Sequence, residues 1–153
     1  MDEALGAIEW KTIFVIAGML PLSTAMQKTG LAATLGQVLV SAVGGYGFLP
    51  LAAGVYLGTT ALTQVLGGQV TALVMAPIAV AAATTTGVSA RSIGVIVAIA
   101  CSSAFLTPLA HPVNLLTVGP GGYSFRDFAR VGAGLTLICF IVILLGSGLL
   151  PGG

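Results

Sequence analysis

Long apolar runs, separated by glycine, proline and charged positions, form the main pattern of this chain. A membrane-spanning helix needs about 20 mostly apolar residues, so these runs predict membrane helices. The pattern predicts a first helix over 10–26 that Pro21 kinks, a short helix over 31–43 lying partly along the membrane interface, and a last span over 131–150. The expected fold class is therefore all-α, a polytopic membrane protein with about four to five hydrophobic helices.

Two apolar arms, 48–66 and 70–84, are joined by a break at 67–69 that contains two glycines. A helix break between hydrophobic flanks predicts a re-entrant hairpin over about 48–84. Unpaired backbone cannot face lipid, so a break at membrane depth is stable only where it is buried in protein or lines an aqueous cavity. Such breaks therefore tend to mark binding sites.

A second break follows a helix that Ser89 is expected to cap. The helical pattern runs from Ser89 to Leu106, is interrupted over 107–114 and resumes weakly over 115–118. This arrangement predicts a broken transmembrane helix over about 89–118. Secondary transporters form binding sites near the middle of the membrane from discontinuous helices of this kind.

Composition supports the membrane assignment and excludes other classes of function. Hydrophobic residues make up 57% of the chain and charged residues 6%, and the segment 29–90 carries no formal charge. The net charge of +1 leaves no basic face for nucleic acid. The single histidine is His111, and the only carboxylates lie at the N-terminus and at Asp127, none of them near a candidate nucleophile. No constellation for catalysis is present, so we expect no enzyme and no cofactor. The whole chain, 1–153, is expected to form one transmembrane domain.

Basic residues next to the last span predict its orientation. Arg126 and Arg130 precede this span, and cytoplasmic loops of membrane proteins carry an excess of arginine and lysine. The loop is therefore expected in the cytoplasm and the C-terminus outside.

The two breaks offer chemistry without charged side chains, and each of their residues has a structural alternative. Helix N-termini bind anions through free N–H groups, while carbonyls and hydroxyls bind small cations. Glycines such as Gly67 also serve close helix packing, and the hydroxyls of Thr59, Thr60, Thr63 and Thr71 are either cation ligands or bonded to a carbonyl one turn earlier. An ionisable residue in an uncharged membrane segment, such as His111, is costly and indicates a role in the transport pathway or a neutral structural hydrogen bond.

Several segments resemble one family of transporters. They are WKTIF at 10–14, TQVL at 63–66, MAPIA at 75–79, and, most specifically, SAFLTPLAHPVN at 103–114 followed by VGPGGY at 118–123. Over nearly its whole length the chain is similar to the divalent anion:sodium symporters and their bacterial permease relatives, in the ion transporter superfamily. Those proteins contain two inverted repeats, each with a hairpin and a broken helix, and this chain resembles the C-terminal repeat only.

The resemblance implies the positions of two sites. It places the substrate site at Gly67, Gly68, Gln69, His111, Pro112 and Asn114. It places a site for a sodium ion at Thr63, Leu66, Gly68 and Ala110. Gly67, Gly68 and Gln69 stand where the family carries Ser-Asn-Thr, so a hydroxyl and an amide are lost. His111 stands where many relatives carry threonine, which suggests a proton-coupled variant.

The expected function is that of half, or a fragment, of a secondary active transporter. It would move a small anion of the dicarboxylate or sulfate class by alternating access, coupled to sodium or protons, in the plasma membrane of a bacterium. One repeat cannot form a site that lies between two, so the expected partners, besides lipid and anion, are an N-terminal half or a second copy of the chain. The alternative is a non-transporting membrane subunit, or a degenerate fragment, that packs against a permease.

Overall fold

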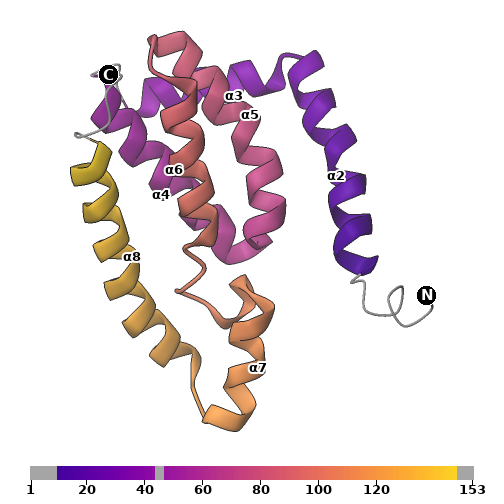
Figure 1. The fold of residues 1–153 in the computed structure, drawn as a ribbon, viewed down its shortest axis with the longest axis vertical. Coiled ribbons are helices and arrows are strands. Elements are labelled where there is room, and N and C mark those ends of the chain that lie inside the picture. The colour runs from indigo at the N-terminus through magenta and orange to yellow at the C-terminus, as the bar shows by residue number, and fades with distance from the viewer. Residues whose placement is uncertain (1–9, 44–46, 148–153) are drawn as a thin grey trace.

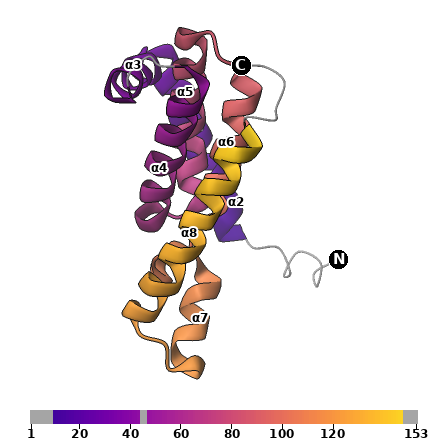
Figure 2. The ribbon, with the colours of Figure 1, turned by 90° about the vertical axis from the view of Figure 1, so that its left-hand side faces the viewer.

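The computed structural model describes residues 10–43 and 47–147, and the regular elements in this part of the chain are all helices (Figures 1 and 2). The all-α expectation is confirmed for these residues, while the predicted end of the last span at 148–150 lies outside them. In chain order the elements are α2 (Trp10–Lys28), α3 (Leu31–Val43), α4 (Phe48–Leu66), α5 (Gly68–Thr86), α6 (Ala90–Ser102), the 3-10 turn η1 (Pro108–Ala110), α7 (Pro112–Gly121) and α8 (Phe125–Ser147).

Three described helices, α4, α5 and α8, are long and apolar enough to cross a membrane. The helices α3 and α6 are apolar but have only 13 residues each. At 1.5 Å per residue such a helix is about 20 Å long, whereas the hydrocarbon core is about 30 Å thick. After α6 the chain continues in the same direction through an unwound segment, 103–111, into α7 (Figure 1).

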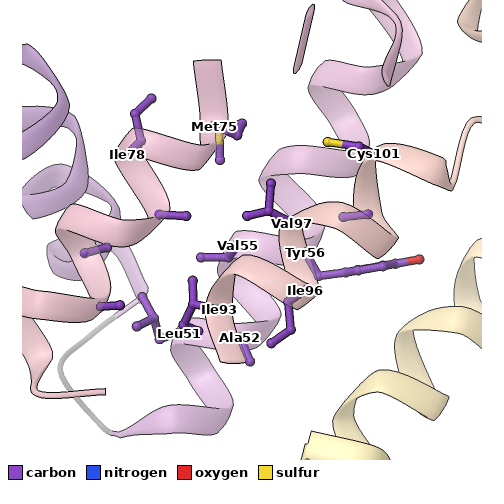
Figure 3. Close-up of a cluster of buried hydrophobic side chains, with 14 of the residues drawn as sticks. Leu51, Ala52, Val55, Tyr56, Met75, Ile78, Ile93, Ile96, Val97 and Cys101 are labelled. Atoms are coloured by element: carbon purple, nitrogen blue, oxygen red, sulfur yellow. The ribbon is translucent and has the colours of Figure 1, made fainter. Parts of the chain in front are cut away.

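The core lies where α4, α5 and α6 pack together (Figure 3). Many of its buried positions are alanines, such as Ala79 and Ala83 on α5 and Ala100 on α6, each with no exposed surface. Small side chains let membrane helices approach closely, which increases the van der Waals contact that stabilises them in lipid. In contrast, α2 stands at the side of this core, and α7 with the first half of α8 extends beyond it (Figures 1 and 2).

The break between α4 and α5 is narrower than the sequence predicts. Gly67 alone lies outside the two helices, whereas Gly68 and Gln69 belong to the first turn of α5. Gly67 has φ +79°, a conformation that glycine adopts without a Cβ penalty. Its N–H still donates to the Thr63 carbonyl at 3.0 Å, and its own carbonyl accepts from the Thr71 N–H at 3.1 Å. One glycine therefore ends one helix and begins the next.

The second break is shifted toward the N-terminus relative to the sequence prediction. Ser89 caps α6 as expected, because its hydroxyl accepts a hydrogen bond from the Ser92 N–H at 3.4 Å. However, α6 ends at Ser102 rather than at Leu106, and α7 begins already at Pro112. Proline suits the first position of a helix because no N–H is needed there. The shift matters because it leaves the backbone of 103–107 free to bond with other parts of the chain.

The last helix begins earlier than residue 131, where the sequence predicts the span to start. Ser124 donates two hydrogen bonds to the Asp127 carboxylate, from its N–H at 2.8 Å and from its hydroxyl at 2.6 Å. An acidic side chain three residues after serine, bonded in this way, stabilises a helix N-terminus. The residues from Phe125 to Arg130 and the apolar run that follows them therefore form one helix, α8.

Gly132 allows α8 to lie directly against the unwound segment. A Cβ atom at Gly132 would overlap the carbonyl oxygen of Phe105 and lie 2.9 Å from the Cα of Leu106. These are backbone atoms, which cannot rotate away as a flexible side chain can. We expect Gly132→Ala to lower the free energy of unfolding in detergent by about 1–3 kcal/mol, the usual cost of overpacking.

Thermal unfolding of the purified variant measures this effect. Gly134→Ala is the matched control, because Gly134 lies on the same helix and a Cβ atom there would meet nothing within 4 Å. Equal unfolding temperatures for the two variants would show that α8 does not rest on the unwound segment.

Candidate functional site

The two helix breaks lie against each other. A Cβ atom built on Gly67 would be 3.7 Å from the carbonyl oxygen of Ala110, in ordinary contact. Beside this contact the Thr107 hydroxyl donates to the backbone carbonyl of Gln64 at 3.1 Å. The structure thus brings together the tip of the α4–α5 pair and the unwound segment 103–111, which are about 40 residues apart in sequence.

Gln64, in the last turn of α4, holds the two breaks together through its side-chain amide. Its Nε2 donates to the Ser103 carbonyl at 2.9 Å and to the Thr60 carbonyl at 3.1 Å. Its Oε1 accepts from the Leu106 N–H at 3.1 Å. The apolar pattern of the sequence predicted no role for Gln64. The available signal was an amide side chain three residues before a break in an uncharged apolar helix.

Asn114, in the first turn of α7, supports the unwound segment from its other end. Its Nδ2 donates to the Ala104 carbonyl at 2.7 Å and lies 3.5 Å from the Thr107 carbonyl oxygen. The amide nitrogen of this predicted substrate ligand is thus used to bind backbone. A substrate role for Asn114 stays a prediction, and it would fall to the side-chain oxygen.

His111 precedes α7 in an extended conformation and its side chain is exposed. Its Nδ1 accepts from the Val113 N–H at 3.3 Å, and its carbonyl accepts from the Asn114 N–H at 3.0 Å. The imidazole therefore caps the N-terminus of α7, whose first residue is Pro112. This is the neutral hydrogen-bonding role that the sequence left open, while the pathway role remains a prediction.

Gly68 provides close packing at the tip. A Cβ atom there would overlap the carbonyl oxygen of Cys101 and lie 3.3 Å from its carbonyl carbon. The neighbouring Gln69 is exposed in the first turn of α5, and Leu66, the last residue of α4, is 45% exposed. Gly68 thus has the packing role that the sequence left open beside a role in binding. The side chains of Gln69 and Leu66 lie at the surface of the tip.

The threonines near the tip differ in their hydrogen bonds. Thr63 is fully buried and its hydroxyl donates to the Thr59 carbonyl at 2.8 Å, the common arrangement in membrane helices. In contrast, the buried hydroxyls of Thr59, Thr60 and Thr71 have no hydrogen-bond partner among the residues that the structure describes. A buried hydroxyl without a partner costs about 1–3 kcal/mol, so these oxygens are available to a water molecule or a cation.

Helix ends determine the electrostatics of the site. The N–H groups at Gly68, Gln69 and Val70 have no helical partner because they form the first turn of α5, and they carry the positive end of the helix dipole. Within the described residues no side chain caps this helix. The last carbonyls of α4 supply the opposite partial charge beside them. Among the described residues no group of histidine, cysteine and carboxylate side chains could hold a metal ion, so any cation here would be bound by neutral oxygens.

Tyr56 places the site at the level of the middle of α8. This fully buried residue extends from the core toward α8 (Figure 3). Its hydroxyl lies 3.3 Å from the Ser103 hydroxyl and 3.2 Å from the Thr136 carbonyl oxygen. Thr136 is the central residue of α8, Phe125–Ser147. The first residue of the unwound segment, which also binds Gln64, is therefore level with the centre of a helix long enough to span a membrane.

A separate hollow lies between the α2–α3 corner and α5, away from the breaks. Most of its lining side chains are apolar and none is charged, and two of them, Ala32 and Ala33, belong to the first turn of α3. It is lined by Gln27, Ala32, Ala33, Ala76, Pro77, Val80 and Ala81.

Comparison with known proteins finds relatives that are named as transporters. A family described as citrate transporter matches residues 1–100. The uncharacterized transporter YfbS of Escherichia coli K12 is 40% identical over 94% of this chain and 24% of its own length. Sodium/sulfate cotransporter 1 of Chlamydomonas reinhardtii is 30% identical over 92% of this chain and 16% of its own. Sodium-dependent dicarboxylate transporter SdcS of Staphylococcus saprophyticus is 26% identical over 94% of this chain and 27% of its own.

The chain spans between 16% and 27% of the length of these relatives. Each of them carries the name of a transporter and none that of an enzyme, in agreement with the expectation from the sequence. The matched residues 1–100 cover α2 to α5 and most of α6, so they include the hairpin arms and the tip. The chain therefore belongs to the citrate transporter family of membrane transporters, and its relatives include sodium-coupled symporters of sulfate and dicarboxylates, the group that its motifs resemble.

Proposed function

We propose that this chain is one repeat, the C-terminal one, of a secondary active transporter that moves a small dicarboxylate or sulfate anion by alternating access. The observation that carries this proposal is the contact of the two helix breaks through Gln64, level with the middle of α8. Secondary transporters bind their cargo at such discontinuities. The relatives named for sodium/sulfate and sodium-dicarboxylate transport support this cargo class.

In this proposal the α4–α5 pair is a re-entrant hairpin whose tip at Gly67 lies near the midplane. Support comes from the depth of Gln64, which binds Ser103 at the level of the central residue of α8. In Figures 1 and 2 the tip also lies well short of the end reached by α7 and α8. A tip at that depth must be covered by protein or water, because its backbone would otherwise face lipid.

The anion would bind at the N-terminus of α5. Free N–H groups and the helix dipole stabilise a negative charge there without a basic side chain. The carboxylate of Asp127, which would repel an anion, is held by Ser124 at the start of α8. Gln69, exposed in the same turn, adds a neutral amide donor at the mouth of this site.

The coupling ion would bind on the α4 side of the tip. Carbonyl oxygens at the C-terminal end of α4 lack helical partners, and sodium binds such oxygens in broken transporter helices. The buried hydroxyl of Thr71, which has no partner in the described part of the chain, would add an oxygen near this end of the hairpin. Protons are the alternative coupling ion, because His111 exposes an imidazole beside the unwound segment.

One hairpin and one broken helix make only half of such a site, so the proposal includes a partner. It is an N-terminal half, on the same or another chain, or a second copy of this chain. The exposed apolar surface supports this, since Val65 next to the tip is 81% exposed and little of α8 is buried within the chain. By the excess of arginine at the start of α8, that end would face the cytoplasm of a bacterium.

The alternative function, a non-transporting subunit or fragment that packs against a permease, also has an observation in its favour. The tip carries Gly67 and Gly68 where the symporters carry serine and asparagine, and the close contact of Gly68 with Cys101 leaves no room for a side chain. A ligand would therefore meet only backbone groups at positions 67 and 68.

Uptake measurements separate the two functions. The chain is expressed with the sequence that precedes it in its genome and, separately, alone, and uptake of labelled sulfate and succinate is measured in membrane vesicles under a sodium gradient or a proton gradient. We expect saturable, gradient-dependent uptake of one anion class only when both halves are present. If vesicles containing both halves take up neither anion under either gradient, the non-transporting alternative is correct.

Substitution of Gly68 tests the tip. Because a Cβ at this position would meet the backbone of Cys101, Gly68→Ala should displace the N-terminus of α5 from α6 and reduce uptake about tenfold or more. Gly58→Ala on α4 is the control, since a Cβ at Gly58 meets nothing within 4 Å. Uptake by Gly68→Ala equal to that of the control would show that the tip is not the site.

The pH dependence of uptake identifies the coupling ion. If His111 carries the coupling proton, uptake without sodium should rise as the pH falls through about 8 to 5, and His111→Ala should remove this rise. Sodium-driven uptake by the same variant is the control for folding. Uptake that is indifferent to pH, both with and without sodium, would exclude proton coupling through His111.

A further inference from the structure

Gln64 uses its side-chain donors and its acceptor on backbone groups. The amide nitrogen has two hydrogens, and these are directed to the carbonyls of Ser103 and Thr60. The amide oxygen accepts from the N–H of Leu106. Two of the three partners belong to the unwound segment, and they are separated there by only two residues, so the amide bridges a donor and an acceptor that the break of the helix left without helical partners.

We propose that Gln64 is the positioning residue of the transport site: it sets the distance between the α5 N-terminus and the unwound segment, and so determines the geometry in which anion and coupling ion are held. This inference rests on the proposed function. Gln64 does not touch the ligand in this proposal, and acts through the backbone that does.

The neighbouring contacts explain why a small change at Gln64 would reach the site. Only two residues separate Gln64 from Gly67, where an added Cβ atom would be 3.7 Å from the Ala110 carbonyl oxygen. The unwound segment is held from its other sides by the Tyr56 hydroxyl at Ser103 and by the Asn114 amide at Ala104. Those contacts fix the segment to α4 and α7. The direct side-chain links between the tip and the segment are then the Gln64 amide and the Thr107 hydroxyl.

Glutamate at this position would supply the wrong groups when it is ionised. A carboxylate has only acceptors, so it would face the carbonyl oxygens of Ser103 and Thr60 with no hydrogen to share. A protonated carboxyl, in contrast, has one O–H donor and one carbonyl acceptor. It can donate to Ser103 and accept from Leu106, and thus restores the bridge between the two breaks. Gln64→Glu therefore converts a permanent contact into one that depends on pH.

Hydrogen exchange measures the contact without any need for transport. Purified parent protein, Q64E and the control Q37E are compared in detergent at pH 7.5 and pH 5, with exchange corrected for the intrinsic effect of pH. Gln37 is exposed on α3, so Q37E carries the same chemical change away from the breaks. We expect segment 103–111 of Q64E to exchange about tenfold faster than the parent at the higher pH and to regain protection at the lower pH. Q37E should match the parent at both.

Apart from residue 64 itself, the titratable groups around the two breaks are the same in parent and variant. They are the Tyr56 hydroxyl, which binds Ser103, the Cys101 thiol and the exposed imidazole of His111. In the described part of the chain, α6 and α8 also carry charged residues. They are Arg91 on α6 and Arg126, Asp127 and Arg130 on α8. Their contribution is removed by taking the difference between Q64E and the parent at each pH.

Uptake by the complete transporter then distinguishes positioning from simple structural support. Q64E should raise the KM for the transported anion at pH 7.5 by about tenfold, with recovery at pH 5, while Q37E follows the parent. If Q64E does not insert into membranes, T107V removes only the hydroxyl that binds the Gln64 carbonyl, and it should loosen the same segment.

Parent-like protection of 103–111 in Q64E at pH 7.5, or lost protection that acid does not restore, would overturn the positioning role. A parent transporter without uptake would instead refute the proposed function, and the exchange experiment distinguishes that result from failure of the contact itself.

Discussion

Backbone groups that leave a helix inside a membrane must find partners within the protein, because lipid offers none. In this chain the partners come from the two breaks themselves. The unwound segment after α6 presents carbonyls and an N–H, and the last turn of α4 presents the Gln64 amide and a free carbonyl that match them. Neither break is satisfied alone, so the hairpin tip and the broken helix depend on each other.

Neutral amides are well suited to this task. Gln64 and Asn114 each direct an amide to the unwound backbone from a neighbouring helix, one from α4 and one from α7. An amide combines donor and acceptor in one side chain and carries no charge to desolvate. In the proposed function, the N–H groups of the first turn of α5 and the α4 carbonyls that neither Gly67 nor Thr107 binds would be left for ligands, so that an uncharged segment could interact with charged cargo.

Glycine provides the short distances that these contacts need. Gly67 adopts the positive φ that lets α5 follow α4 without a loop. Gly68 lets α5 pack against the backbone of α6, and Gly132 lets α8 pack against the backbone of the unwound segment. The symporters carry serine and asparagine where this chain has Gly67 and Gly68. The glycine at position 68 fits the close approach of α6, which leaves no room for a side chain there. In the proposed function, a ligand at Gly67 and Gly68 would therefore be bound by backbone groups.

The sequence by itself determined the membrane character, the helical class and the existence of both breaks, because these follow from local composition and from the need to hide unpaired backbone. It also located α3 and α4 at their observed bounds and identified Ser89 as a cap. The tertiary structure alone decided that the breaks meet, that α6 ends at Ser102, and that Gln64 is the link between them. Those outcomes depend on hydrogen bonds between residues about 40 positions apart, and the pattern of apolar and polar residues along one segment carries no record of such partners.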